Sequence, residues 1–415
     1  MSAASDKPDA GAGGAAGRGV RWRGVAERSV RFLAPLYAFR VPVLAWSTAY
    51  FLLWCYRTVF SVLGDVVVMR LTNIADTRSY QRQELLTAVD NMIVAGQTGG
   101  ILMQAAATAL TKLIGGVFGL LSFNNPIAIN IGFQTIGFLG MLAFLRALDP
   151  RDRRIVYGLF LLPSITVWSS IASKEALLVG FVGVVCAYIV KFYKNEEGSI
   201  VVPAICLFLV GVFKPHFMPA LLLLLGVSYV ARYTEWKTTL ALLALIASLL
   251  VLYVMRERVD EFARYVDWAL LSMGGNSARE PFIVEVNDVF LKAPLGMYLA
   301  FAGPTLSEAG KGLLHALTFT ESIVIVFVMV YFLVRRLPVI PAYSFILALG
   351  ALFWILFATY PPAVSNPGTA IRYRTGYILI VFLCFVILPS RSMYIDWING
   401  WRARVLAKRR SGPAA

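Results

Sequence analysis

Long apolar stretches separated by short polar segments recur along most of the 415 residues of the chain. A helix needs about 20 predominantly apolar residues to cross the hydrocarbon core of a bilayer. The pattern therefore predicts an all-α, polytopic transmembrane helix bundle of about ten spans. The predicted spans are residues 41–64, 126–148, 155–168, 172–191, 199–213, 216–232, 239–255, 317–334, 341–359 and 375–391.

One further apolar stretch, residues 95–121, is long enough to cross the membrane but carries Gln97, Gln104, Lys112 and several glycines. These residues favour an amphipathic or re-entrant helix at the membrane surface. Counting the stretch as an eleventh span would also move the basic segment 149–154 to the outside, whereas Lys and Arg are enriched in cytoplasmic loops. We therefore expect ten spans, with both termini in the cytoplasm.

The composition supports a membrane protein, because 59% of the residues are hydrophobic and only 15% are charged. Soluble domains contain about 25% charged residues. Basic residues crowd the two ends of the chain, residues 1–40 and 392–415, and account for much of the net charge of +15. Such basic flanks orient membrane helices. The sequence thus predicts a disordered basic tail, a transmembrane domain at 41–391, a second basic tail, and no nucleic-acid partner.

The residues that commonly bind metals are few and scattered. The four cysteines lie inside apolar stretches, where they are expected to pack as small hydrophobic side chains. The two histidines belong to no Cys/His cluster with the spacing of a zinc site. The sequence also contains neither a Walker motif nor a G-x-G-x-x-G fingerprint. We therefore expect no metal and no cofactor.

The unusual polar residues gather in the segments that this topology places on the outer side. The outer loops are residues 65–125, 256–316 and 360–374, with shorter turns at 168–173 and 214–217. The loop 256–316 begins with charges of alternating sign at helical spacing, which predicts a salt-bridged amphipathic helix.

The first polar cluster is the segment WSSIASKE at residues 168–175. Ser169 or Ser170 is expected to cap the following helix, and Lys174 then lies in its first turns, where helix amides and an ammonium group favour phosphate. The alternative is an interfacial tryptophan beside a lysine that extends to the headgroups. Glu175 completes no capping box, because the residue three positions earlier is alanine.

The second cluster, KPH at residues 214–216, interrupts a long apolar run. The proline ends or kinks the helix and frees carbonyl groups, which is tolerated at membrane depth where the backbone lines a polar cavity. The alternative is a plain loop between two short helices. His216 can act as a base or donate a hydrogen bond to phosphate.

The third cluster, SNPGTAIRYRTGY at residues 365–377, precedes the last predicted span. Arg372 and Arg374 are two positions apart, so an extended backbone would point them to one side and a helix would splay them. Paired guanidinium groups match the oxygens of pyrophosphate. The alternative is an ion pair with an outer-loop carboxylate such as Glu257 or Asp260.

These segments together resemble a broad group of bacterial membrane proteins of exopolysaccharide and O-antigen synthesis, similar to Wzy-type polysaccharide polymerases and GT-C-type glycosyltransferases. The resemblance covers roughly residues 70–390 and rests on PSxxxWSSxxxKE, a (K/R)PH break, a loop proline before an acidic span start (Pro304 and Glu321) and NxGTxxRYR. Asp76 and Tyr80 match an acidic-plus-tyrosine position of that group.

The resemblance implies transfer or polymerisation of glycan units from polyprenyl-(di)phosphate-linked donors at the outer face of the bacterial inner membrane. Implied partners are the lipid-linked oligosaccharide, the bilayer and other polysaccharide-assembly proteins. The implied site residues are Asp76, Glu175 and His216 as candidate bases, Lys174, Lys214, Arg372 and Arg374 for phosphate, and Tyr80, Trp168 and Tyr373 for sugar stacking.

Two other classes of function remain open at this point. A flippase or transporter for a lipid-linked glycan would need polar residues along its spans, whereas here they collect at one face. A non-catalytic subunit of a polysaccharide export complex would tolerate alanine at Asp76, Arg372 or Arg374, whereas an enzyme would lose its function.

Overall fold

The computed structural model describes residues 46–65, 75–81, 102–194, 196, 198–231, 233–272, 278–336 and 342–387. The chain divides into two compact units, Met1–Phe51 and Leu52–Ala415. In the first unit only residues 46–51 are described, as the start of helix α3 (Trp46–Leu63), in which the ring of Trp46 stacks on that of Tyr50. Both predicted basic tails lie outside the described residues, and the following paragraphs concern the second unit.

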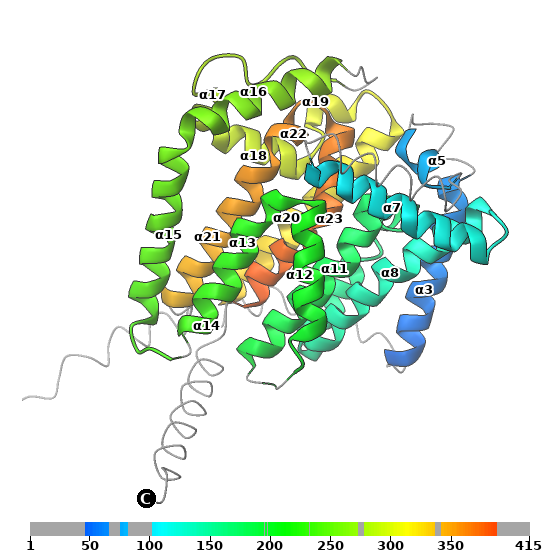
Figure 1. Cartoon of the computed structure of the whole chain (residues 1–415), viewed down its shortest axis with the longest axis horizontal. Helices are drawn as coiled ribbons and strands as arrows, with labels where there is room; N and C mark the ends of the chain where they lie inside the picture. The colour runs from blue at the N-terminus through cyan, green and yellow to red at the C-terminus, as the bar shows by residue number, and fades with distance from the viewer. Residues whose placement is uncertain are drawn as a thin grey trace, which may run out of the picture. The chain divides into compact units, whose positions relative to one another are not determined.

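Every regular element in the described residues is helical, and none is a strand. Six helices are long and apolar enough to cross a membrane, which confirms the all-α membrane architecture (Figure 1). They are α8 (Pro126–Ala147), α11 (Lys174–Tyr193), α15 (Lys237–Val254), α20 (Leu313–Arg336), α21 (Ala342–Thr359) and α23 (Pro367–Val386). Six such helices are consistent with a multi-pass membrane protein.

A seventh span is formed if two bent segments are counted together. Helix α12 (Val201–Phe213) meets the segment Pro215–Ala231 at an angle of 120°. That segment comprises η2 (Pro215–Phe217), α13 (Met218–Leu222), η3 (Leu223–Val227) and α14 (Ser228–Ala231). The break falls at the KPH cluster, as the sequence predicts, because proline cannot continue the hydrogen-bond ladder of α12.

The predicted count of about ten spans is not confirmed. The predicted span 155–168 is divided between α9 (Pro150–Leu159) and α10 (Pro163–Trp168), both too short to cross. Leu162 has an extended backbone, with φ −63° and ψ 127°, as expected for the residue before a proline. The predicted span 41–64 contains α3, which is not among the candidate membrane spans and whose Arg57 is completely buried.

The apolar stretch at 95–121 forms α7 (Leu102–Leu121), whose described apolar part is too short to count as a span. It lies steeply inclined to the upright helices α12 and α15 (Figure 1). The short helix α5 (Ala75–Gln81) packs on it so closely that a Cβ at Gly115 would approach the carbonyl oxygen of Tyr80 to 2.2 Å. Residues 95–101 lie outside the described residues, so the surface location of this stretch stays a prediction.

Helices α8 and α11 are the most closely packed pair of the bundle. A Cβ added at Gly140 of α8 would meet the carbonyl oxygen of Gly180 in α11 at 2.1 Å. Small residues let two backbones approach in this way inside membranes, where van der Waals contact drives helix association. The result is a rigid support for the N-terminus of α11, which carries Lys174 and Glu175.

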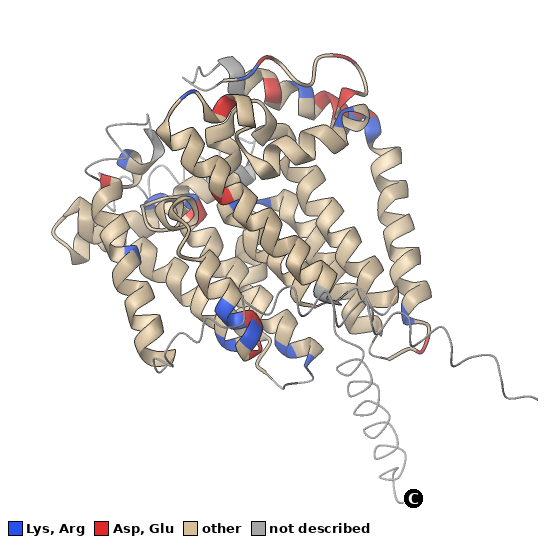
Figure 2. Ribbon diagram, turned by 180° about the vertical axis from the view of Figure 1, so that it is seen from behind, with Lys and Arg blue, Asp and Glu red and all other residues tan. Residues whose placement is uncertain are grey.

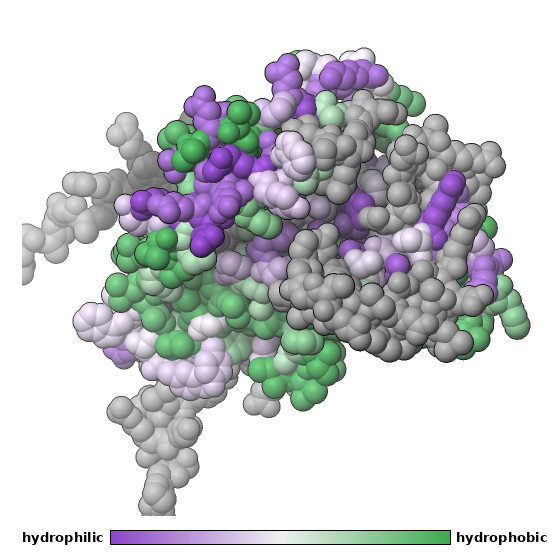
Figure 3. Space-filling view, turned by 45° about the horizontal axis from the view of Figure 1, so that its top comes forward, coloured by the Kyte–Doolittle hydropathy of each residue, from purple (hydrophilic) through white to green (hydrophobic). Residues whose placement is uncertain are grey.

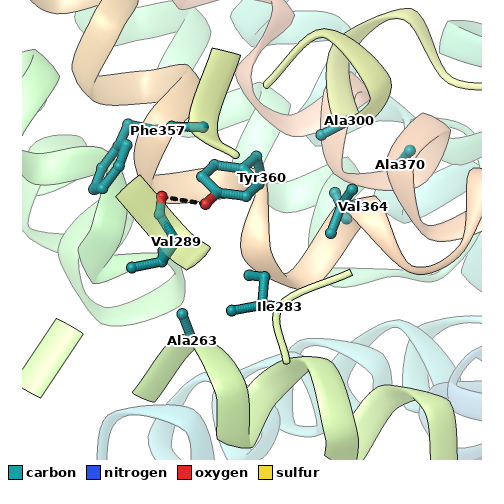
Figure 4. Packing of buried hydrophobic residues seen from close by; sticks show 10 residues of the cluster. Ala263, Ile283, Val289, Ala300, Phe357, Tyr360, Val364 and Ala370 are labelled. Carbon is teal, nitrogen blue, oxygen red and sulfur yellow. Dashed lines mark hydrogen bonds between the residues drawn. The ribbon is translucent and has the colours of Figure 1, made fainter. Parts of the chain in front are cut away.

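Five short or amphipathic helices form a layer at one end of the bundle, here named the helical cap (Figure 1). Tyr360 lies in its hydrophobic cluster, and the Tyr360 hydroxyl donates a hydrogen bond to the carbonyl oxygen of Val289 (Figure 4). The amphipathic helix predicted after residue 256 is present as the first of the five. They are α16 (Arg256–Ser272), α17 (Asp288–Leu291), α18 (Ala293–Ala302), α19 (Leu306–Ala309) and α22 (Pro361–Val364).

Charged residues concentrate at the two ends of the bundle, and the long helices between them carry few (Figure 2). Hydrophilic side chains gather on the end that carries the helical cap, whereas hydrophobic side chains cover the sides below it (Figure 3). The sides include α15, of whose span only 17% is buried, against 78% for α23. Apolar side chains left exposed in this way suit contact with lipid.

Candidate functional site

The three polar clusters found in the sequence meet at one place in the structure. The Nε of Arg372, in α23, lies 3.0 Å from Oε1 of Glu175, in the first turn of α11. The Nζ of Lys214, at the end of α12, lies 3.8 Å from the centre of the Tyr373 ring. Segments about 40 and 160 residues apart therefore form one group of side chains, named the motif cluster: Trp168, Lys174, Glu175, Lys214, Arg372 and Tyr373.

Helix α11 begins differently from the sequence prediction. Its N-cap is Ser173, whose hydroxyl accepts a hydrogen bond from the amide of Ala176 at 3.1 Å. Ser169 and Ser170 do not cap the helix, because the chain makes another turn after them. Ser173 also donates to the carbonyl oxygen of Trp168 at 3.0 Å, which closes the turn that carries Trp168.

Ser169 instead contacts a buried arginine that the sequence analysis missed. The guanidinium of Arg57 donates to the Ser169 hydroxyl at 2.9 Å and to its carbonyl oxygen at 2.5 Å, and it reaches the Met141 sulfur at 3.3 Å. Arg57 lies in an apolar run with no local pattern, and only its charge within a predicted span marked it. It ties α3 and α8 to the turn that precedes α11.

Asn130 is a second unpredicted residue that holds the same turn. Its side-chain oxygen accepts hydrogen bonds from the Ala172 amide at 2.8 Å and from Gln81 at 3.0 Å, while its nitrogen donates to the Ser61 carbonyl at 3.2 Å. One buried amide thus connects α3, α5 and α8 to the start of α11. The signal in the sequence was a lone polar residue in an apolar run.

Lys174 reaches across to α7. Its Nζ lies 2.7 Å from the hydroxyl of Thr108, so the position of α7 over this end of the bundle is coupled to the first turn of α11. Lys174 is half-buried. The snorkelling lysine considered in the sequence analysis is therefore hydrogen-bonded within the protein.

The KPH break contains Lys214, a cation beside the ring of Tyr373, and His216, which packs on an aromatic neighbour. Lys214 is half-buried, and among the described residues it has no carboxylate within salt-bridge distance. His216 packs edge-on against Phe217, with ring centres 4.9 Å apart, and Phe217 in turn contacts Tyr377. Lys214 therefore belongs to the motif cluster, while His216 is held by an aromatic contact next to it.

Arg372 and Arg374 point in different directions because α23 already begins at Pro367, so the RYR motif is helical rather than part of an outer loop. Arg374 is completely buried and donates to the Phe301 carbonyl at 3.1 Å and to the Ser322 hydroxyl at 2.6 Å. Neither arginine pairs with Glu257 or Asp260, the carboxylates considered above. Arg372 pairs instead with Glu175.

Asp76 and Tyr80, the predicted acidic-plus-tyrosine position, both lie in the short helix α5. The backbone of Asp76 lies in α5, but its side chain is outside the described part of the structure. Tyr80 is only 2% exposed, so its ring contributes to packing between α5 and its neighbours instead of an open sugar-binding surface. Glu321, named in the sequence only as a span start, accepts the Ser164 amide at 3.1 Å on Oε1 and 3.2 Å on Oε2.

The charges of the motif cluster do not balance. Of the six residues that define the cluster, Lys174, Lys214 and Arg372 are cations and Glu175 is a carboxylate, which gives this set a net charge of +2. The Glu175 side chain is 2% exposed, and its Oε2 is buried without a hydrogen-bond partner among the described residues. The guanidinium of Arg372 also lies over the Trp168 ring, 5.7 Å from its centre. A set of residues with more cations than carboxylates, one of which pairs with an incompletely satisfied carboxylate, suits an anionic ligand.

The carboxylates of the helical cap are satisfied. Burial acts to raise the pKa of Glu308, but hydrogen bonds from Arg279 at 2.7 and 2.8 Å and from the Thr305 amide lower it to about 2. Burial raises the pKa of Asp267, against the amides of Ile283 and Phe282 that donate to it.

Asp288 is held in the same manner as Glu308. Hydrogen bonds from Lys292 at 2.8 Å and from the amides of Glu285 and Val284 lower its pKa. Arg279, the partner of Glu308, also donates hydrogen bonds to the carbonyl oxygens of Val364 and Gly303 and so connects three segments of the cap. These groups fix the fold of the cap.

Among the described residues, no three His, Cys, Asp or Glu side chains lie together as a metal-binding group. Comparison of the sequence with models of protein families found no match, and comparisons with curated proteins and with solved structures found none either. The functional argument therefore depends on the geometry of the motif cluster and on the motifs themselves.

Proposed function

We propose that this protein is a membrane-embedded glycosyltransferase or polysaccharide polymerase that uses polyprenyl-(di)phosphate-linked donors at the outer face of the bacterial cytoplasmic membrane. One observation carries the proposal. The WSSIASKE, KPH and RYR motifs, far apart in the sequence, come together in the motif cluster, where Arg372 pairs with the buried Glu175 and Lys214 lies on the ring of Tyr373. The proposed partners are the lipid-linked oligosaccharide, the surrounding bilayer and other proteins of polysaccharide assembly.

The cations suit the leaving group of such a donor. A polyprenyl diphosphate is anionic and anchored in the bilayer, so its headgroup must be met at the end of a membrane bundle beside lipid-facing helices. Lys174, Lys214 and Arg372 supply positive charge at this end without relying on an exposed surface patch. Partly buried cations stabilise developing negative charge more strongly than solvated ones, because the local dielectric constant is lower.

The reaction requires a base and a nucleophile supplied by the acceptor. An acceptor hydroxyl oxygen attacks the anomeric carbon of the donor and forms the new glycosidic bond. The bond from that carbon to the phosphate oxygen breaks, its electron pair leaves with the (di)phosphate, and the hydroxyl proton passes to a carboxylate. Glu175 is the carboxylate that pairs with Arg372, and we assign it this role ahead of Asp76 and His216.

The aromatic residues supply surfaces for sugar. Trp168 and Tyr373 are half-buried and each already faces a cation, Arg372 and Lys214 respectively. We propose that these rings line the sugar path beside the phosphate-binding cations. Arg374 is proposed to position α23 through its bonds to Phe301 and Ser322, because it is completely buried and lies on another side of the helix.

Deletion of the gene in the host bacterium, followed by complementation, tests the proposal. The deletion strain is expected to lose a surface or extracellular polysaccharide and to accumulate its polyprenyl-linked precursor. Wild-type protein should restore the polymer, whereas Glu175→Gln and Arg372→Gln should not, at equal membrane levels on immunoblots. Arg258→Gln serves as a matched control, because the Arg258 side chain is 82% exposed on the helical cap.

Two outcomes would contradict the proposal. A deletion strain with unchanged glycans and no accumulated lipid-linked precursor would exclude a role in glycan assembly. A precursor that accumulates on the cytoplasmic side, out of reach of an impermeant glycosidase in intact spheroplasts, would identify a flippase instead. Accumulation on the outer side, where the glycosidase cleaves it, is the result expected for a transferase or polymerase.

A further inference from the structure

The Arg372–Glu175 pair joins the two groups that the proposed reaction would use separately. Arg372 is a ligand for the donor phosphate, and Glu175 is the base for the acceptor, yet their side chains lie 3.0 Å apart. A guanidinium that forms an ion pair with a carboxylate has less charge to offer a second anion. A carboxylate held by a guanidinium is likewise a weaker proton acceptor.

Glu175 is held less completely than a structural carboxylate of this protein. Glu308 and Asp288 each accept at least three hydrogen bonds. Glu175 has one cation at Oε1, while its Oε2 is buried without a partner among the described residues. A buried carboxylate oxygen left unsatisfied costs free energy, so an ion pair held by the other oxygen alone is a weaker anchor than the carboxylates of the helical cap.

We propose that Glu175 is an internal counter-ion of Arg372 that the diphosphate of the donor displaces, so that the base is released only when the donor is bound. This inference rests on the proposed function. Arg372 exchanges one anion for another, and the more highly charged diphosphate takes the guanidinium together with Lys174 and Lys214. Glu175 then loses its ion pair and accepts the proton of the acceptor hydroxyl.

The surroundings of Arg372 permit this exchange without a large movement. Its guanidinium already lies over the Trp168 ring, a contact that does not require Glu175 and that keeps the charge near the cluster. The close α8–α11 packing at Gly140 and Gly180 holds the backbone of α11, whose first turn carries Glu175. The arginine side chain is therefore the part that moves, and the carboxylate stays in place.

Binding of inorganic pyrophosphate to the purified protein in phosphatidylcholine nanodiscs, measured by titration calorimetry, tests the exchange. Removing the competing carboxylate in Glu175→Gln is expected to tighten pyrophosphate binding by about tenfold, although glycan assembly is lost. Arg372→Gln is expected to weaken binding. In the double variant Glu175→Gln/Arg372→Gln the gain should disappear, because the two residues act through one contact.

The Glu175→Asp variant covers the case in which Glu175→Gln fails to fold. The shorter side chain keeps the charge but withdraws it from the guanidinium, so a smaller gain in pyrophosphate affinity is expected. Folding of each variant is checked by size-exclusion chromatography and thermal unfolding.

Several results would overturn the inference. Equal or weaker binding by both folded Glu175 variants would show that the carboxylate does not compete with the anion. A gain that persists without Arg372 would assign the competition to another cation, and absence of pyrophosphate binding in all variants would remove the anion site. Loss of pyrophosphate binding when the wild-type protein is placed in phosphatidylglycerol nanodiscs instead would identify a phospholipid headgroup as the occupant of the site.

The binding result and the glycan result separate the two proposals. If Glu175→Gln binds pyrophosphate more tightly but deletion of the gene leaves the cellular glycans unchanged, the ion-pair exchange is supported and the glycosyl transfer is refuted. If the deletion strain loses the polysaccharide but Glu175→Gln gains no affinity for pyrophosphate, the glycosyl transfer is supported and the exchange is refuted.

Discussion

The helical cap and the motif cluster lie toward the same end of the bundle and both contain buried carboxylates, but they balance charge in opposite ways. In the cap, Arg264, Arg279 and Lys292 face Asp260, Asp267, Asp288 and Glu308, which leaves a net charge of −1, and backbone amides donate to all four carboxylates. The motif cluster contains three cations and one carboxylate, Glu175, which pairs with Arg372 through Oε1 and whose Oε2 has no hydrogen-bond partner in the part of the chain that the structure describes.

This difference separates a structural network from a binding site. Saturated buried networks stabilise one conformation, and the loss of any member leaves a charge without a partner. An unsaturated group with excess charge costs stability in the free protein and gains its missing partner from a ligand. The comparison predicts that substitutions in the cap change folding, whereas substitutions in the cluster change activity.

The largest expected effect is that of Arg279→Met in the helical cap. The substitution removes both bonds to Glu308 and those to the carbonyl oxygens of Val364 and Gly303. Because Glu308 is left charged and nearly buried, we expect the free energy of unfolding to fall by about 3–5 kcal/mol. Thermal unfolding of the detergent-solubilised protein measures the loss.

Arg258→Met is the matched control, because its side chain is exposed on α16 and should cost no more than about 0.5 kcal/mol. A melting temperature of Arg279→Met equal to that of this control would mean that the cap network does not stabilise the fold.

A smaller effect, on activity rather than on stability, is expected for Lys214→Gln in the motif cluster. In the proposed function the ammonium contributes to donor binding, so the KM for the lipid-linked donor should rise about tenfold, equivalent to about 1.4 kcal/mol. Stability should fall only by the worth of the contact with Tyr373, about 0.5–1 kcal/mol. Steady-state kinetics with purified protein, with Lys311→Gln as the exposed-lysine control, give both values. A large loss of stability with unchanged KM would place Lys214 among the structural residues.

The last effect, which is confined to acid pH, is the pH dependence of stability that Glu308 confers. Its pKa is lowered to about 2 in the folded protein from an ordinary value of 4.5, so the ion pair stabilises the fold fully above that ordinary value. The stabilisation should be lost as the pH falls from about 4.5 toward 2, and the melting temperature should be flat between pH 5 and 8 with respect to this group. Glu308→Gln should melt lower at neutral pH and show a weaker acid dependence. An unchanged acid dependence in Glu308→Gln would assign it to other carboxylates.

The sequence predicted the positions of the long apolar helices better than it predicted the number of membrane spans. Apolar length marked α8, α11, α15, α20, α21 and α23, but it also counted segments that proline divides, such as the one around Pro163. Hydropathy averages over a window, whereas the end of a helix is decided by one backbone conformation. The Ser169 cap was wrong for the same reason, since one more turn of chain moves the cap to Ser173.

The sequence by itself determined that this is an all-helical, multi-pass membrane protein, because burying about twenty apolar residues in lipid requires a helix whatever its neighbours are. It also indicated which segments carry unusual polar residues. Only the tertiary structure decided that Glu175 faces Arg372, that Lys214 lies on Tyr373, and that Arg57 and Asn130 hold the turn before α11. These contacts join residues distant in the chain, and their geometry depends on how the helices pack rather than on any local pattern.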